Sequence, residues 1–154
     1  MEIYRFQCPL GLLTLEASDG ALVRLSWGAE GAACAAPPSP LMAKAERQIR
    51  AYFSHELQVF DLPLRVAGSD FQRAVCVQIS AIPLGETRTY GDLAQVLGVP
   101  AQAVGQACGG NPIPLIIPCH RILGAQGLGG FSGSGGVESK VQLLRHEGAA
   151  GLLI

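Results

Sequence analysis

A cysteine and a histidine stand side by side at Cys119 and His120, directly after the apolar stretch NPIPLIIP. A thiolate is a strong nucleophile, and a neighbouring imidazole can accept the proton that the thiol loses. Such a base needs an acceptor to orient it, commonly a carboxylate. The carboxylates in the second half of the chain are Asp70, Glu86, Asp92, Glu138 and Glu147. The pair therefore indicates nucleophilic chemistry. Spacing alone does not identify which carboxylate would orient the histidine.

The segment Ile113 to Pro118, which leads to this cysteine, is stiff and apolar. Its prolines exclude a helix, so we expect it to cross the core as an extended, strand-like segment. Asn111, just before it, can bridge backbone groups of the turn. Such a segment would hold the thiol of Cys119 rigidly where the chain leaves the core.

A glycine-rich stretch, GAQGLGGFSGSGG, follows from Gly124 to Gly136. It lacks the GxxxxGK(S/T) pattern, so it does not predict a nucleotide-binding P-loop. One interpretation is a loop whose backbone N–H groups line a pocket beside Cys119. The other is a surface linker to the last helix, which we place at Val137 to Glu147 and which Gly148 would end.

Two capping patterns mark the helices that must position this segment. Ser69 with Gln72 predicts the start of one helix, and Thr89 with Asp92 predicts the start of the next. In the second helix we expect Leu93, Val96 and Leu97 to form the buried stripe. Gly98 would end that helix, and Pro100 can open another that runs to Cys108. Two short helices joined by a glycine turn describe a helix-turn-helix.

The second of these helices reads AQAVGQACGG and has neither Lys nor Arg. Its small residues, among them Gly105, keep it thin. An ordinary helix is about 10–12 Å across with its side chains, which is too wide for a minor groove of about 6 Å. A thin helix could approach such a groove closely if the groove widened. The alternative is that small residues allow the helix to pack tightly inside the protein.

The first part of the chain reads as a small sheet with one helix. Three strands are expected at residues 1–8, 11–17 and 21–27, with a hairpin turn at Ser18-Asp19-Gly20. Ser39 caps a helix from Pro40 to Phe53, and Phe60 to Ala67 is expected to be a linker. The predicted class is therefore α+β. An N-terminal lobe over 1–67 precedes a mostly helical, winged helix-turn-helix-like domain over 68–154.

Composition limits the possible partners and location. The net charge of −1 does not predict non-specific binding of nucleic acid through bulk charge. No apolar run reaches the roughly 18 residues that a membrane span needs, and no secretory signal is visible. The five cysteines form no CxxC pair, so a cytoplasmic protein with free thiols is expected.

Four motifs in order resemble the O6-alkylguanine-DNA alkyltransferases. They are GETRTYGDLA from Gly85, AVG from Ala103, PCHR from Pro118 preceded by Asn111-Pro112, and HEG from His146. The resemblance spans residues 69–148, while the first lobe matches only in general character. It implies repair of DNA by irreversible, single-turnover transfer of the alkyl group of O6-alkylguanine, and also of O4-alkylthymine, to Cys119.

The resemblance also implies catalytic roles. His120 would take the thiol proton through a water molecule, and Glu147 would orient the imidazole. Asn111 would brace the segment that carries the thiol. Tyr90 would press on the phosphate backbone and assist proton transfer to the leaving guanine.

Binding roles follow from the same resemblance. Double-stranded DNA would be bound through its minor groove by a monomer, with no cofactor and no metal. The DNA contacts would be Tyr90, Gln72, Gly105 and Gln102, the last standing where the family usually has an Arg that fills the gap left by the flipped base. The residues expected to contact the flipped base are Phe131, Ser132 and Ile122.

Two other functions are compatible with parts of the sequence. A non-catalytic sensor of alkylated DNA would have lost its reactive cysteine, and Cys119 is present, so only Gln102 favours it. A thiol hydrolase could use Cys119 and His120, but the sequence has no evident oxyanion-hole motif. Transfer of a methyl group to the protein would distinguish repair from both.

Overall fold

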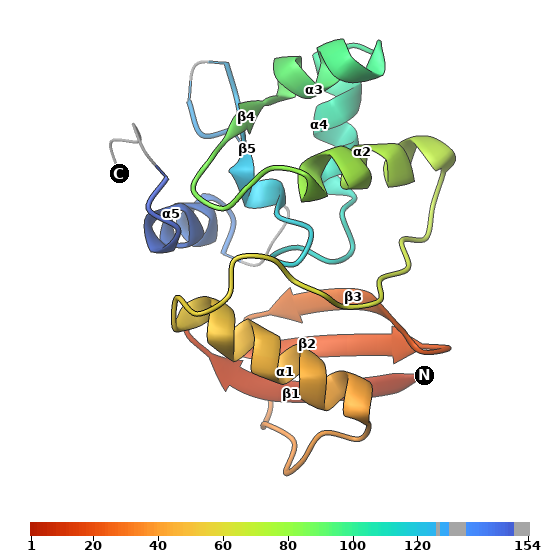
Figure 1. The fold of residues 1–154 in the computed structure, drawn as a ribbon, viewed down its shortest axis with the longest axis vertical. Coiled ribbons are helices and arrows are strands. Elements are labelled where there is room, and N and C mark those ends of the chain that lie inside the picture. Colours follow the sequence, from red (N-terminus) through yellow and green to blue (C-terminus); the bar gives the residue numbers. More distant parts are fainter. Residues whose placement is uncertain (126, 130–134, 150–154) are drawn as a thin grey trace. The chain divides into compact units, whose positions relative to one another are not determined.

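The structure is a computed structural model that describes residues 1–125, 127–129 and 135–149. The chain divides into two compact units, Met1–Val66 and Ala67–Ile154. Figure 1 shows a three-stranded sheet with one helix in the first unit and helices with a short strand pair in the second. The expected α+β class, with a small sheet before a mostly helical part, is confirmed.

The sheet of the first unit is an antiparallel meander of β1 (Glu2–Cys8), β2 (Gly11–Ser18) and β3 (Ala21–Trp27). Asp19 and Gly20 both have positive φ, at 51° and 78°. Two such residues in a row form the tight turn whose twist matches that of the flanking strands. The strands and the turn therefore lie where their sequence pattern predicts them.

Helix α1 (Pro40–Phe53) lies against this sheet (Figure 1). Its buried residues recur at helical spacing and are Met42, Ala45, Ile49 and Tyr52. Ser39 accepts a hydrogen bond from the Met42 amide, as expected of an N-cap. The segment expected to be a linker is instead part of the first unit. Leu22 donates its amide to Pro63 O, and Arg65 donates to Leu22 O, so this segment pairs with β3.

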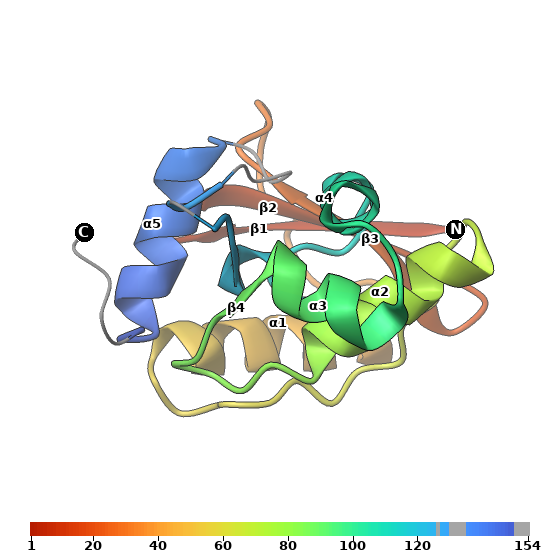
Figure 2. The same cartoon turned by 90° about the horizontal axis from the view of Figure 1, so that it is seen from above.

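Three helices make up most of the second unit: α2 (Asp70–Ser80), α3 (Tyr90–Leu97) and α4 (Ala101–Gly109). The side chains and backbones of Thr89 and Asp92 exchange both hydrogen bonds of a capping box at the start of α3. Gly98 ends α3 in the left-handed conformation, and α4 begins after Pro100. Figure 2 shows α3 and α4 from above, joined by this short turn. The predicted helix-turn-helix is therefore present.

A short parallel strand pair links this motif to the cysteine segment. Strand β4 (Arg88–Thr89) directly precedes α3, and β5 (Ile122–Leu123) directly follows the 3-10 helix η1 (Cys119–Arg121). Parallel pairing brings corresponding ends of two strands together. The first residue of α3 therefore lies at the side of β5. Helix α5 (Val137–His146) packs against η1 and ends at Glu147.

Three details of the expected second unit were wrong. Ser69 caps α2 through the Gln72 amide, but the Gln72 side chain does not complete a capping box and turns to Ala107 O instead. Val96 is exposed rather than part of the buried stripe. The segment before Cys119 is buried but not extended. Ile117 N donates to Ile113 O, and Leu115 has a φ of 78°, so the chain makes a tight turn there.

Candidate active site

Cys119 opens the 3-10 helix η1 and is buried, with 4% of its surface exposed. The turn before it is closed by the side chain of Asn111. That amide donates to Ile117 O at 2.9 Å, and its oxygen accepts the Ile113 amide at 3.0 Å. The backbone of Cys119 is in turn tied to Ile117 O at 2.8 Å. The expected bracing by Asn111 therefore has a clear geometric basis, because one buried amide fixes both ends of the turn.

Glu147 receives hydrogen bonds from both residues that follow the cysteine. Its Oε2 atom lies 2.6 Å from His120 Nε2. The Arg121 guanidinium donates to the same carboxylate twice, at 2.8 Å to Oε1 and 3.0 Å to Oε2. The two-point contact fixes the carboxylate plane and so the direction from which it engages the imidazole. Of the five candidate carboxylates, the one paired with His120 is Glu147.

Burial and charge set the protonation states of this network. Burial lowers the pKa of His120 below its ordinary value, against the opposing influence of Glu147. Burial by itself would raise the pKa of Glu147. The hydrogen bonds and charges of His120 and Arg121 outweigh burial and lower that pKa to about 2. At neutral pH the site therefore holds a neutral imidazole beside an ionised carboxylate, which is the state that a general base requires.

Tyr90, the first residue of α3, stands between the cysteine segment and an open cavity. Burial raises its pKa, and the negative charges that Cys108 and Cys119 carry as thiolates raise it further, so its hydroxyl keeps its proton. A methyl group at Gly129 would come within 3.1 Å of the Tyr90 ring, and Gly129 has a φ of +69°. A side chain at that position would be strained, because of both the close contact and the left-handed backbone conformation. The loop after β5 therefore passes directly against Tyr90.

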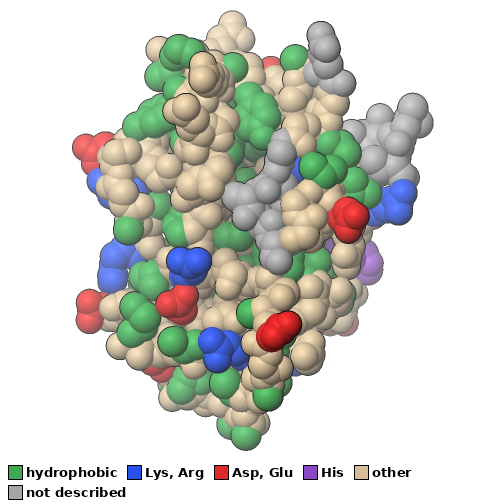
Figure 3. Space-filling view, turned by 180° about the vertical axis from the view of Figure 1, so that it is seen from behind, with side chains coloured by type: hydrophobic (Ala, Val, Ile, Leu, Met, Phe, Trp, Pro, Cys, Tyr) green, Lys and Arg blue, Asp and Glu red, His purple; other side chains and the backbone are tan. Residues whose placement is uncertain are grey.

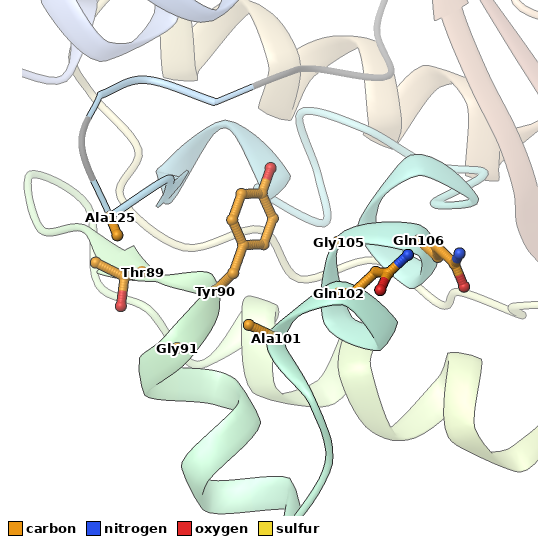
Figure 4. Close-up of a pocket in the computed structure, with 8 residues that line it drawn as sticks. All are labelled: Thr89, Tyr90, Gly91, Ala101, Gln102, Gly105, Gln106 and Ala125. Carbon is orange, nitrogen blue, oxygen red and sulfur yellow. The ribbon is translucent and has the colours of Figure 1, made fainter.

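The cavity has a volume of about 590 Å³ and is formed by the start of α3, one face of α4 and Ala125. Figure 4 shows Tyr90 projecting from the start of α3, and Gln102 and Gln106 from α4. Three residues expected to contact DNA, Tyr90, Gln102 and Gly105, thus line one recess. Cys119 is not one of the described residues that line this recess.

Gly105 has no internal packing reason to be glycine. Apart from the adjacent residues and the backbone of α4 itself, no described atom lies within 4 Å of a Cβ built at this position. Glycine within a helix costs about 1 kcal/mol relative to alanine. The alternative explanation for the thin helix, tight packing inside the protein, therefore does not apply to this residue. A side chain is missing on the face of α4 that lines the cavity.

The remaining predicted residues lie elsewhere. The Gln72 amide is engaged inside the unit, donating to Ala107 O at 2.8 Å and to Cys76 Sγ at 3.7 Å. Its role as a DNA contact remains a prediction. Ile122 is fully buried on β5, directly after η1. Phe131 and Ser132 lie outside the described residues.

Two buried cations had no place in the sequence interpretation. Arg121 was noticed only as part of the PCHR motif, and Lys140 was not singled out. Arg121 also donates to Ile82 O at 2.6 Å, so its guanidinium joins η1 to the end of α2 as well as to Glu147. Lys140 donates its ammonium to backbone carbonyls near β5. Arg121 could have been recognised from the sequence, because a guanidinium is always charged and a buried one needs a carboxylate partner.

In the part of the chain that the structure describes, no three His, Cys, Asp or Glu side chains gather as a metal site would need. None of the described helices is long and apolar enough to cross a membrane.

The fold and the site define a class: a helix-turn-helix protein in which a buried cysteine is followed directly by a histidine that pairs with a buried glutamate. Family models agree with this description. The DNA-binding domain of 6-O-methylguanine DNA methyltransferase matches residues 70–149, and the ribonuclease-like domain of the same enzyme matches residues 3–66. The chain belongs to the 6-O-methylguanine DNA methyltransferase family.

Individual relatives are similar over most of the chain. A methylated-DNA–protein-cysteine methyltransferase of Mycolicibacterium paratuberculosis is 43% identical, with 90% of this chain and 87% of the relative covered. One of Methanosarcina acetivorans is 38% identical, with 94% and 96% covered. The crystal structure of Mycobacterium tuberculosis OGT in complex with DNA is 40% identical. It superposes with a TM-score of 0.83, covering 96% of this chain and 92% of that one.

Proposed function

We propose that this protein repairs DNA by moving the alkyl group of O6-alkylguanine irreversibly onto Cys119. Its family membership and its cysteine methyltransferase relatives make it a DNA-repair alkyltransferase. The residues that act, the lesion and the mode of docking are inferred from the site. The observation that carries the inference is the buried network in which His120 and Arg121, the two residues that directly follow Cys119, both engage Glu147.

The proposed reaction begins with loss of the Cys119 thiol proton. His120 accepts this proton, through a water molecule, on the ring nitrogen that does not face Glu147. The carboxylate then stabilises the imidazolium, because its low pKa keeps it ionised. The sulfur attacks the alkyl carbon, a C–S bond forms, and the C–O bond breaks with its electron pair moving to guanine. Tyr90 supplies a proton to the leaving base, and the proton held by His120 restores the tyrosine.

The thioether that forms is stable, so each molecule acts once. This end point follows from the chemistry, because no step of the proposed reaction cleaves the C–S bond and regenerates the thiol. O4-alkylthymine presents the same kind of O-alkyl carbon next to a ring nitrogen and is proposed as a second substrate. A monomer is sufficient, because every residue in the proposed mechanism belongs to one chain.

The proposed DNA contact is made by α4 in the minor groove, with the lesion base turned out of the stack. Supporting observations are the missing side chain at Gly105 and the two amides that line the cavity, those of Gln102 and Gln106. Extrusion of a base costs a few kcal/mol. Gln102 is proposed to occupy the gap that the base leaves. The expected contacts of Phe131, Ser132 and Ile122 with the base belong to the same proposal.

The test is intact-protein mass after mixing with duplex DNA that carries one O6-methylguanine. The protein should become heavier by one methyl group, and peptide mapping should place it on Cys119. Cys119→Ser should abolish transfer while the fold and DNA binding persist. Cys108→Ser is the matched control, because Cys108 is a second buried thiol of the same unit and should remain dispensable for methyl acceptance. A methyl group on Cys8, Cys34, Cys76 or Cys108 would contradict the assignment.

A further inference from the structure

Lys140 is a buried cation that the proposed reaction does not use. It lies on α5, and its side chain is fully buried. Charged side chains are rarely buried this completely unless they are paired. Its ammonium donates to the backbone oxygen of Ile122 at 2.5 Å and also to that of Leu128. The ammonium therefore joins α5 to two points on the chain that follows the reactive cysteine.

These two points enclose the first part of the glycine-rich segment. Ile122 also donates its amide to Cys119 O, at the end of η1. A continuous path of hydrogen bonds thus runs from the cysteine backbone through Ile122 to Lys140 and on to Leu128. The Leu128 end lies next to Gly129, which packs against Tyr90. One side chain therefore holds the cysteine turn and the Tyr90-facing loop in register.

The Lys140 ammonium also interacts electrostatically with two cysteines, Cys119 and Cys108. Burial lowers its pKa to about 8, and thiolates at Cys119 and Cys108 act in the opposite direction and raise it. Burial and then Cys119 raise the pKa of Cys108 to about 12, and the Lys140 ammonium acts against them. Burial lowers the pKa of His120, and the ammonium adds to that effect. The titratable groups around it are thus Cys108 from α4 and Cys119 and His120 from η1. By reciprocity, an ammonium that a Cys119 thiolate stabilises must stabilise that thiolate.

We propose that Lys140 is a positioning residue for alkyl transfer: it ties the Cys119 turn to the loop beside Tyr90, and its positive charge favours the Cys119 thiolate. The proposal extends the function proposed above, because it assigns a residue to the same site. It is not a role in proton transfer. His120 remains the base, and Lys140 acts through the position and charge state of the sulfur.

The chain has two lysines, Lys44 and Lys140, which makes a direct measurement possible. Protein labelled with ¹³C at the lysine ε-carbon should give two NMR signals. Lys44, on the surface of α1 with its side chain 43% exposed, serves as the internal reference. The Lys140 signal should titrate well below the ordinary lysine pKa of 10.5, at about pH 8. In Cys119→Ser the Lys140 midpoint should move lower still, because the thiolate that stabilises the ammonium is gone. An unchanged midpoint in Cys119→Ser would overturn the proposal.

Variants test the consequence for the sulfur. Lys140→Met keeps the aliphatic length and removes the charge, Lys140→Arg keeps the charge, and Lys44→Met is the control. The reaction of Cys119 with iodoacetamide, followed by peptide mapping across pH, reports its thiolate without any DNA. Lys140→Met should move this profile about one pH unit upward and slow the reaction about tenfold at neutral pH. Lys140→Arg should restore the profile in part, and Lys44→Met should not move it.

The outcomes separate the two proposals. A folded Lys140→Met protein with an unchanged iodoacetamide profile would show a purely structural lysine and overturn the inference. If Lys140→Met does not fold, the response of the Lys140 signal to Cys119→Ser decides. A further outcome is that the Lys140 signal responds to Cys119→Ser and the iodoacetamide profile shifts in Lys140→Met, while the wild-type protein takes no methyl group from DNA. In that case the proposed function fails and the inference about the thiolate stands.

Discussion

Glu147 keeps its negative charge in a buried position because two neighbours compensate it. A carboxylate without partners in that place would take up a proton. The bidentate Arg121 contact and the 2.6 Å contact to His120 reverse this tendency. The arrangement has one asymmetry: Arg121 is always charged, whereas burial keeps His120 neutral. The imidazole is thus the partner whose proton can change during a reaction.

Removal of the base should therefore slow chemistry without weakening binding. We expect His120→Ala to reduce the single-turnover rate of methyl transfer by about 10²–10⁴. DNA affinity should stay within a few-fold of the wild-type value, because His120 is not among the residues that line the cavity on α4. Rates come from quenched mixing with O6-methylguanine duplex, and affinity from titration with the same duplex. His55→Asn is the control, since His55 is exposed and has a φ of 61°, which Asn tolerates. A normal rate of methyl transfer in His120→Ala at neutral pH would refute the assignment of His120 as the general base.

The same two side chains predict how stability depends on pH. Burial lowers the pKa of His120, so below its ordinary value of 6.5 the unfolded chain binds a proton that the folded chain does not. The pKa of Glu147 falls from 4.5 to about 2, so its contribution is present above pH 4.5 and is lost as pH falls toward 2. Both changes lower the free energy of unfolding in acid. The Glu147 part amounts to about 3 kcal/mol, at about 1.4 kcal/mol for each pH unit.

Urea denaturation at a series of pH values measures this effect. The wild-type protein should lose stability from about pH 6.5 downward. Glu147→Gln should flatten the part below pH 4.5. It should also be less stable at neutral pH by about 3–5 kcal/mol, because Arg121 is left as a buried charge without its partner. A Glu147→Gln protein as stable as wild type at pH 7 would mean that the network contributes little.

Among the secondary-structure elements, local sequence signals located most of the fold. The Ser39 and Thr89 caps, the Asp19-Gly20 turn and the Gly98 stop each act through hydrogen bonds or torsions of adjacent residues, and so they are legible in sequence. The turn before Cys119 could not be predicted from local sequence signals. Proline content excluded a helix correctly, but the choice between an extended and a turned chain depended on the Asn111 side chain reaching Ile117 O, six residues away.

The site was predictable only in part for a similar reason. Motif resemblance picked out Cys119, His120 and Glu147, and the structure joins the last two directly. Periodicity alone left five carboxylates open. Buried Arg121 and Lys140 contradict the ordinary expectation that long charged side chains face solvent. Their partners are backbone carbonyls and a distant carboxylate, which no local pattern reveals.

Helix α4 carries the prediction for DNA binding. The resemblance described above implies that Gln102 stands where the family usually has an Arg. The Gln amide is also planar and can hydrogen-bond, but the side chain is shorter and uncharged. Gln102→Arg should speed methyl transfer from duplex DNA and leave the reaction with the free base O6-methylguanine unchanged, because the free base needs no extrusion. Single-turnover rates on both substrates measure this. Gln106→Arg is the matched control, one turn along the same face. If Gln106→Arg gives the larger gain on DNA, Gln106 and not Gln102 reaches the stack.

At the scale of the whole molecule, the charge distribution sets how the protein searches DNA. The net charge is −1, and α4 has no Lys or Arg. On the face shown in Figure 3, acidic and basic side chains are scattered, and no large patch of one sign stands out. Each phosphate that a protein neutralises adds about −0.9 to the slope of log K against log salt. A surface of this kind can neutralise few phosphates, so its binding should depend on groove shape and base extrusion.

We therefore expect a slope no steeper than about −2 for binding to a methylated duplex, which is at most roughly a 16-fold loss of affinity between 50 and 200 mM salt. Fluorescence anisotropy with Cys119→Ser measures it, because this variant should bind without consuming the lesion. The unmodified duplex is the control: it offers the same phosphates, so its slope should match while its affinity is weaker. A slope near −6 would reveal many phosphate contacts, and the protein would then hold DNA chiefly by charge. A steeper slope on methylated than on unmodified DNA would mean that base extrusion itself brings new phosphates into contact.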